Sequence, residues 1–246
     1  MNMNEKMFSF AVAAIALLKP ASGAAISVMI GLNMKKIRSF LKSIPARGWA
    51  AVLLWLALNC SVYFGTRLLP AGTVYHDISS PIDHRIPLVP PMIVVYILAY
   101  CTWGINYLLI AREDGEIARR VFTGAYVAKL ICLVCFLVFP TAMQRPEPTG
   151  SDVFSALTRL IYRLDAPNNL LPSIHCLESW LCWRGLFGIK RVSRGYKAFS
   201  LIFALLVFAS TLLVRQHCLI DVPAGVLVGE IGLLASRLIW RKGSAK

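Results

Sequence analysis

Long apolar stretches alternate with short polar ones along most of the chain. A helix needs about 20 apolar residues to cross a bilayer core of about 30 Å. Six stretches meet or approach that length, and the fourth of them is the shortest. They cover residues 49–69, 91–110, 119–140, 173–189, 197–214 and 219–240. This pattern predicts an all-α fold, a polytopic transmembrane bundle with six core spans.

One further apolar stretch, from Phe8 to Leu32, precedes these six and is interrupted by Lys19-Pro20. It could be a seventh span, a signal-like leader, or translated sequence upstream of a start at Met34. The residues that begin at Met34, Met-Lys-Lys-Ile-Arg, are typical of an amino terminus. We therefore expect residues 1–33 to be dispensable and residues 34–246 to form one membrane domain.

The composition excludes an ordinary soluble domain. Hydrophobic residues make up 57% of the chain and charged residues 15%, with a mean hydropathy of +0.65, whereas soluble domains are about 45–50% apolar and about 25% charged. The net charge of +14 would suggest nucleic acid as a partner of a soluble protein. Here the basic residues lie between apolar stretches, so we expect the bilayer as partner and no nucleic acid.

The distribution of basic residues predicts an orientation. With residues 33–48 placed in the cytoplasm, the loops and tail on that side hold 17 Lys and Arg, and the opposite loops hold 6. Because cytoplasmic loops carry an excess of Lys and Arg, we expect a cell-membrane protein with both ends of the core in the cytoplasm. The loops 70–90 and 141–172 and the turn near 215–218 then face outward.

Three short outward segments contain most of the chemistry-bearing side chains: 144–146, 172–175 and 215–221. They lie at the outward ends of different predicted spans, so the bundle is expected to bring them to one depth. His217 precedes Asp221 by four residues, a spacing that places both on one side of a helical turn. The carboxylate can hold the imidazole in one tautomer while its other nitrogen attacks an electrophile.

A second imidazole, His175, follows Pro172-Ser173, and proline is favoured in the first turn of a helix. The free N–H groups of that helix would then face an anion. Arg145 supplies a guanidinium fork that suits phosphate oxygens. One imidazole can attack phosphorus and the other can protonate the departing oxygen. The sequence therefore predicts phosphoryl transfer without a metal or cofactor.

Structural interpretations of the same residues remain open. Either histidine alone could be structural, and Asp221 could simply cap a helix. His76 and His84 lie in a loop together with Asp77 and Asp83, and we interpret that group as a solvated loop rather than a metal site.

The segments Pro172-Ser173-x-His175 and His217-x-x-x-Asp221, with Arg145-Pro146 upstream, resemble the signature motifs of the integral-membrane type-2 phosphatidate phosphatase/haloperoxidase superfamily. The resemblance in span layout covers roughly 49–240 and implies a six-helix bundle. It also implies that His217 is the nucleophile toward phosphorus, Asp221 its orienting partner and His175 the acid for the leaving group. Arg145 and Ser173 would bind phosphate.

The chain departs from the phosphatase pattern at two cations. Val138 stands where the pattern has a lysine, and Ser210-Thr211 stands where it has Ser-Arg. Arg215 could replace one of them as a phosphate ligand. A similar pattern without the full set of cations occurs in the related sphingomyelin and inositol-phosphorylceramide synthases, which transfer a phospho-headgroup between lipids.

Two smaller patterns concern the surroundings of this site. Residues 151–165 show apolar positions at helical spacing, which predicts an amphipathic helix at the outer interface that could roof the site. Its Arg159 and Arg163 could receive anionic headgroups or serve only as interfacial anchors. Glu178, three residues after His175, could orient that histidine.

The sequence thus favours a lipid phosphate or polyprenyl diphosphate phosphatase that acts through a phosphohistidine at the outward membrane face. The alternative is a lipid headgroup transferase of the inositol-phosphorylceramide or sphingomyelin synthase type, which differs only in the second acceptor. A third hypothesis is a catalytically silent membrane scaffold or transporter built on the same bundle.

Overall fold

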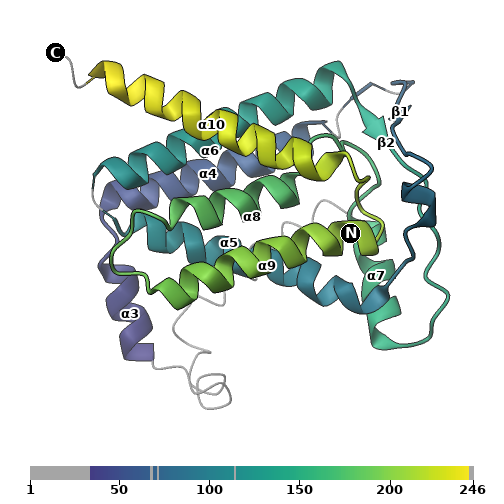
Figure 1. Ribbon diagram of the computed structural model, residues 1–246, viewed down its shortest axis with the longest axis horizontal. Coiled ribbons are helices and arrows are strands. Elements are labelled where there is room, and N and C mark those ends of the chain that lie inside the picture. The colour runs from purple at the N-terminus through teal and green to yellow at the C-terminus, as the bar shows by residue number, and fades with distance from the viewer. Residues whose placement is uncertain (1–33, 67–68, 71, 114, 244–246) are drawn as a thin grey trace.

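The computed structural model describes residues 34–66, 69–70, 72–113 and 115–243. Its α-helices are α3 (Met34–Lys42), α4 (Ala46–Gly65), α5 (Ile93–Ala111), α6 (Glu116–Val138), α7 (Val153–Leu164), α8 (Ile174–Gly185), α9 (Arg194–Leu213) and α10 (Asp221–Gly243). Two 3-10 turns, η2 (Asp83–Arg85) and η3 (Pro90–Met92), precede α5. Two short parallel strands, β1 (His76–Asp77) and β2 (Thr141–Ala142), pair in the register His76 to Thr141. The mainly helical fold is confirmed (Figure 1), while the expectation for residues 1–33 lies outside the described residues.

Four helical segments are long and apolar enough to cross a membrane: Pro90–Ala111, Glu116–Val138, Arg194–Leu213 and Asp221–Arg241. A fifth results if Lys35–Lys42 and Ala46–Tyr63, which meet at 93°, count as one bent span. The expected fourth span shortens to the 12 residues of α8, which are about 18 Å long at 1.5 Å per residue. The protein is therefore a multi-pass membrane protein, but six core spans are not confirmed.

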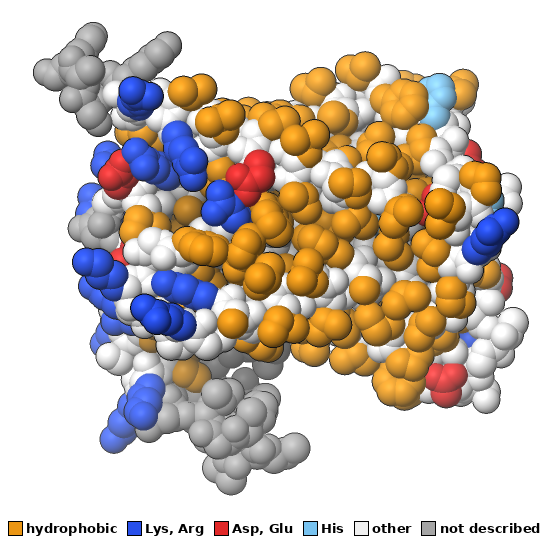
Figure 2. All heavy atoms as spheres, in the orientation of Figure 1, with side chains coloured by type: hydrophobic (Ala, Val, Ile, Leu, Met, Phe, Trp, Pro, Cys, Tyr) orange, Lys and Arg blue, Asp and Glu red, His pale blue; other side chains and the backbone are white. Residues whose placement is uncertain are grey.

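The surface divides into an apolar belt and a basic end (Figure 2). Large apolar side chains such as Leu54, Leu130, Val134, Ile202 and Leu227 are exposed along the long helices, as expected for helices that face lipid. The basic side chains gather at the end that holds α3 and the α8–α9 connection (Figures 1 and 2). The two-stranded ladder and α7 lie at the opposite end (Figure 1).

The short helix α8 lies within the bundle, in contact with α5, α6, α9 and α10. Most of its side chains are buried, which explains why so short a helix has no lipid-facing stripe. Its approach to α10 requires glycine: a Cβ on Gly225 would lie 2.5 Å from the carbonyl oxygen of Ser173. The sequence Pro-Ala-Gly at 223–225 thus brings the backbone of α10 against the start of α8.

The amphipathic helix expected at 151–165 is confirmed as α7. Asp152 caps its N-terminus by accepting from the N–H groups of Phe154 and Ser155. The apolar side chains of α7 pack on a small cluster at the start of α5 and the end of α9: Phe154, Leu157 and Ile161 lie against Ile93, Tyr96 and Val214. The helix therefore covers the end of the bundle at which the expected chemistry lies.

A buried ionic cluster ties four helices together in the middle of the bundle. Glu178 on α8 accepts from the phenol of Tyr107 on α5 at 2.6 Å and from the indole N–H of Trp55 on α4 at 3.2 Å. Lys129 on α6 lies 2.7 Å from the same carboxylate, and both charged side chains are fully buried. The expectation that Glu178 orients His175 is wrong, because its carboxylate binds these three side chains instead.

A candidate phosphoryl-transfer site

The three predicted segments meet at one end of the bundle. The backbone N–H of Ser173 donates to the carbonyl oxygen of Asp221 at 3.2 Å, which joins the second segment to the third. The guanidinium of Arg145 donates to the side-chain oxygen of Gln216 at 2.8 Å, which joins the first segment to the third. The rings of His175 and His217 lie 6.2 Å apart between centroids. The bundle therefore places two imidazoles within reach of one small group.

The turn between α9 and α10 fixes His217 against Asp221. Nδ1 of His217 lies 3.1 Å from Oδ2 of Asp221, and the backbone N–H of Cys218 donates to the same oxygen at 2.8 Å. An ionised carboxylate only accepts hydrogen bonds, so this contact favours the tautomer of a neutral imidazole in which Nδ1 carries the proton and Nε2 the lone pair. The pairing expected from the spacing is therefore present, in a tight turn ahead of α10 rather than within a helix.

His175 sits in an aromatic cage. Its ring stacks on Tyr96 with a centroid distance of 4.1 Å, and the rings of Trp103 and Tyr100 lie at 5.1 and 5.2 Å. The residue is buried, and its Nε2 has no hydrogen-bond partner among the described residues. Packing rather than hydrogen bonding therefore sets the direction of this ring.

Ser173 caps the helix that carries His175. Its hydroxyl oxygen accepts from the backbone N–H of Cys176 at 3.3 Å, so α8 begins at Ile174 and Pro172 lies one residue before the cap. The expectation that Pro172 lies in the first turn of the helix is therefore wrong, because Pro172 precedes the cap residue. The positive end of the helix dipole still points into the site.

Arg145 is held by the protein itself. In addition to Gln216, its guanidinium donates to the carbonyl oxygens of Asp165 at 2.9 Å and Tyr162 at 3.1 Å, and it lies 4.0 Å from the ring centre of Tyr162. Burial lowers the pKa of Arg145 below its ordinary value. The expected phosphate ligand therefore has most of its guanidinium donors directed at α7 and Gln216.

Arg215 is buried and adopts a left-handed backbone conformation, with φ at 55°. Its guanidinium donates to the carbonyl oxygens of Asp83 and Ile86, while its Nε has no hydrogen-bond partner among the described residues. Arg215, which the sequence offered as a substitute phosphate cation, thus fastens the turn before His217 to the loop around η2.

The two arginines expected to meet headgroups differ in their surroundings. Arg159 donates to the carbonyl oxygens of Pro148 and Gly150 at 2.7 and 2.8 Å, so it ties α7 to the segment before it. Arg163 is exposed on the same helix. Only Arg163 therefore presents its charge to the outside.

The loop at 76–86 contains a residue whose importance the sequence did not reveal. His76, Asp77 and His84 are exposed, as expected of a solvated loop, but Asp83 is only 2% exposed. One of its carboxylate oxygens accepts from the backbone N–H of Leu219 at 2.6 Å. Burial raises the pKa of Asp83, but hydrogen bonds from Ser80 and Leu219 and the charge of Arg215 outweigh it, so the pKa falls below 3.8. The sequence pattern could not reveal this role, because Asp83 binds the backbone N–H of Leu219 rather than a side chain.

The thiol of Cys218, next to His217, is not a competing nucleophile. Burial raises its pKa to about 11, so it stays protonated near neutral pH. No group of three or more His, Cys, Asp or Glu that could hold a metal ion occurs within the described ranges.

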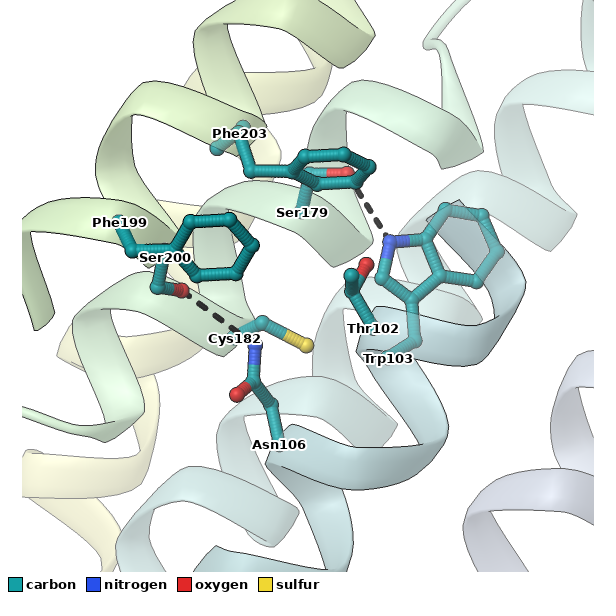
Figure 3. Close-up of a pocket in the computed structure, with 9 residues that line it drawn as sticks. Thr102, Trp103, Asn106, Ser179, Cys182, Phe199, Ser200 and Phe203 are labelled. Carbon is teal, nitrogen blue, oxygen red and sulfur yellow. Dashed lines mark hydrogen bonds between the residues drawn. The ribbon is translucent and has the colours of Figure 1, made fainter. Parts of the chain in front are cut away.

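Two hollows lie near these residues. A cavity of about 10 Å³ between α5, α8 and α9 is lined by Trp103, Asn106, Ser179 and Ser200 (Figure 3), and it holds no more than about one water. A larger, open hollow of about 360 Å³ is lined mostly by apolar side chains: Ile78, Ser80, Asp83, Leu219, Ile220 and Pro223. It lies beside the turn that carries His217 and has the size for part of a lipid.

Comparison with known proteins gives a single assignment. A model of the PAP2 superfamily matches residues 72–235, a range that includes all three segments of the site. No curated protein and no solved structure matches the chain. The matched range is well over half of the sequence, and the chain belongs to the PAP2 superfamily, the type-2 phosphatases that its motifs resemble.

Proposed function

We propose that the protein hydrolyses the phosphate ester of a membrane lipid, or a polyprenyl diphosphate, through a phosphohistidine on His217. Membership of the PAP2 superfamily indicates phosphatase-type activity on phosphorylated substrates. The observation that carries the finer proposal is the pair of imidazoles 6.2 Å apart, one of which is held by a buried carboxylate.

The reaction has two steps. Nε2 of His217 attacks phosphorus, the bond to the ester oxygen breaks, and that oxygen leaves with a proton from the His175 ring. Water then attacks the phosphohistidine, gives up a proton to His175, and releases phosphate while the N–P bond breaks. Asp221 stabilises the positive charge that develops on His217.

The distances support this division of roles. Attack requires a nitrogen about 3–3.5 Å from phosphorus, and proton transfer requires a hydrogen bond of about 2.6–3.2 Å on the far side. Two rings with centroids 6.2 Å apart can turn one nitrogen each toward opposite sides of a phosphoryl group. The free N–H groups at the start of α8, which Ser173 caps, supply donors for the equatorial oxygens.

A lipid substrate fits the surroundings of the site. The open hollow beside Leu219 and Ile220 is mainly apolar, and both side chains are exposed at the rim of the belt. The basic residues collect at the opposite end of the bundle (Figure 2), and basic ends of membrane proteins face the cytoplasm. We therefore place the reaction at the outer face of the cell membrane.

Headgroup transfer is the second candidate, and two observations favour keeping it. Val138 occupies the position of a phosphate-binding lysine in the phosphatase pattern, and Arg145 and Arg215 donate to protein oxygens. With fewer free cations, the site would bind a diester headgroup more readily than a dianionic phosphate. In that reaction a lipid hydroxyl replaces water in the second step.

The test uses the purified full-length protein in mixed micelles. Phosphatidate, a polyprenyl diphosphate, and headgroup-labelled phosphatidylinositol with ceramide as acceptor are supplied in parallel. Release of inorganic phosphate from either of the first two supports hydrolysis, and a new labelled lipid supports transfer. A matched control replaces the exposed His84 by alanine, which should leave the rate unchanged. Inertness toward every substrate would overturn the proposal in favour of a silent scaffold. Equal rates in the wild type and His217→Ala would overturn the phosphohistidine mechanism.

A further inference from the structure

Asp83 contacts the turn that carries His217 on both sides of that histidine. Upstream, the Asp83 carbonyl oxygen accepts from the guanidinium of Arg215. Downstream, its carboxylate oxygen Oδ1 accepts from the backbone N–H of Leu219 at 2.6 Å. One residue of the η2 turn thus holds the residues two before and two after the histidine.

The second carboxylate oxygen makes this attachment rigid. Oδ2 of Asp83 accepts from the backbone N–H of Ser80 at 2.8 Å and from its hydroxyl at 2.6 Å. These bonds fix the rotamer of a side chain that is 2% exposed, so Oδ1 points at Leu219 without further ordering. Hydrogen bonds to a charged acceptor are stronger than neutral ones.

Other contacts of the turn at 215–219 come from the site itself: Arg145 donates to Gln216, and Asp221 accepts from the Cys218 N–H. Arg215 adopts a left-handed conformation, which is uncommon for a residue other than glycine. The N–H groups of Gln216 and His217 both donate to the carbonyl oxygen of Thr211, so the turn folds back on the end of α9. From the loop before α5, the turn is held by Asp83 and by a contact of 3.5 Å between Oγ of Ser79 and Sγ of Cys218, and the two bonds to Asp83 are the ones that flank the histidine.

We propose that Asp83 is a positioning residue for His217, which acts by clamping the backbone of residues 215–219 from the loop before α5. The inference rests on the proposed function for its effect on turnover, but the clamp itself is a property of the backbone. It also gives a role to a loop that precedes all three motif segments.

The expected effect is on the reaction step more than on binding. A displacement of about 1 Å between reacting groups can lower a rate about 100-fold. Asp83→Ala should therefore lower kcat by about 10-fold to 100-fold, a larger effect than its effect on KM, which Asp83 can also alter because it lines the open hollow. Asp83→Asn retains one oxygen for Leu219 and should fall between this variant and the wild type.

Two matched controls come from the same loop. Asp77 is exposed, and its carboxylate accepts from Ser79, with the backbone N–H at 2.8 Å, so Asp77→Asn should leave kcat unchanged. Ser80→Ala removes the hydroxyl that donates to Oδ2 of Asp83 and accepts from its N–H, but it leaves the bond from Leu219, so its kcat should fall less than that of Asp83→Ala. A general loosening of the loop would instead lower kcat in Ser80→Ala as much as in Asp83→Ala.

Hydrogen exchange measured by mass spectrometry tests the clamp without reference to activity. In Asp83→Ala, amide exchange in the peptide that covers residues 214–220 should rise about tenfold, with a smaller rise in Ser80→Ala and none in Asp77→Asn. Unchanged exchange overturns the inference even if no substrate is ever turned over. Raised exchange with normal kcat in an active enzyme also overturns it, because the histidine would then not depend on the clamp. A wild type inert toward all substrates would overturn the proposed function alone.

Discussion

Two buried polar clusters lie one helical turn apart on α8, and they differ in how many of their buried polar atoms have a hydrogen-bond partner. Around Glu178, the carboxylate accepts from Trp55 and Tyr107, and Lys129 Nζ lies 2.7 Å from it as an ion pair although it makes no hydrogen bond of standard geometry within the described part of the chain. Around His175, several buried polar atoms have no hydrogen-bond partner among the described residues: His175 Nε2, Arg215 Nε, Gln216 Nε2 and Asp221 Oδ1.

This difference is the one expected between a structural cluster and the proposed reactive cluster. A buried polar atom without a partner costs about 1–3 kcal/mol, so a group of such atoms persists only where something else maintains it. At the His175 end, the aromatic cage and the clamp from Asp83 hold the side chains in place. At the Glu178 end, the bonds themselves connect α4, α5, α6 and α8. The cluster around His175 therefore has donors and acceptors free to bind a substrate, whereas the cluster around Glu178 has few.

The largest expected effect is the loss of turnover in His217→Ala. Removal of a nucleophile that forms a covalent intermediate typically costs several orders of magnitude, so we expect kcat to fall by more than about 10³-fold. Because His217 makes one side-chain contact with Asp221 and lies at the end of the bundle, the unfolding temperature should change by no more than a few degrees. Phosphate release and intrinsic tryptophan fluorescence on heating measure the two quantities. If His217→Ala lost its activity because it unfolds, His217 would have a structural role instead.

The next effect concerns His175, the ring in the aromatic cage. Loss of a general acid typically costs about 10²-fold to 10⁴-fold with an alkoxide leaving group. We expect His175→Ala to show that loss on a lipid phosphate and a much smaller one on an aryl phosphate, whose oxygen leaves without protonation. Rates on the two substrates, each divided by the wild-type rate, provide the measurement. An equal loss on both would show that His175 acts by shape or binding instead.

The Glu178 cluster should show the opposite behaviour. Glu178→Ala leaves Lys129 buried without its counter-charge and removes the acceptor for two aromatic donors, which we expect to cost about 3–5 kcal/mol of unfolding free energy. The matched variant Lys129→Met with Glu178→Met removes both charges and should recover most of that loss. Thermal unfolding in detergent compares the three proteins. If Glu178→Ala were as stable as the wild type but inactive, the cluster would belong to the chemistry.

The helices were largely predictable from apolar periodicity, because lipid-facing and buried positions are both apolar over the length of a span. The expected 91–110, 119–140, 197–214 and 219–240 correspond to α5, α6, α9 and α10. The fourth expected span, 173–189, was wrong in length. The enclosed α8 is as apolar as a lipid-facing helix but has 12 residues, and composition does not distinguish burial in protein from burial in lipid.

The candidate site was predictable for residues that side-chain type and spacing identify, and not for residues whose role depends on a hydrogen bond with a backbone group. His217, Asp221 and His175 were singled out by residue type and spacing, and the structure brings their segments together, while their catalytic roles stay predictions. The bond from the Leu219 N–H to Asp83 leaves no trace in the sequence, so Asp83 was interpreted as part of a solvated loop. The contacts of Arg145 with backbone carbonyls were equally invisible.

The smallest expected effect tests how closely the reactive cluster depends on helix packing. A Cβ at Gly225 of α10 would lie 2.5 Å from the carbonyl oxygen of Ser173, whereas a Cβ at Gly104 of α5 would have no atom within 4 Å. Overpacking costs about 1–3 kcal/mol, so Gly225→Ala should lower the unfolding free energy by that amount and shift the start of α8. Gly104→Ala should be neutral or stabilise the protein by up to about 1 kcal/mol, since alanine favours a helix.

Because Ser173 both caps α8 and bonds to Asp221, the shift in Gly225→Ala should move His175 relative to His217 and lower kcat more than stability alone explains. If the fractional loss of kcat equalled the fraction of unfolded protein, the loss of activity would come from unfolding alone, and both clusters would respond to the same packing. If kcat fell by more than the unfolded fraction explains, the cluster around His175 would tolerate less displacement than the cluster around Glu178.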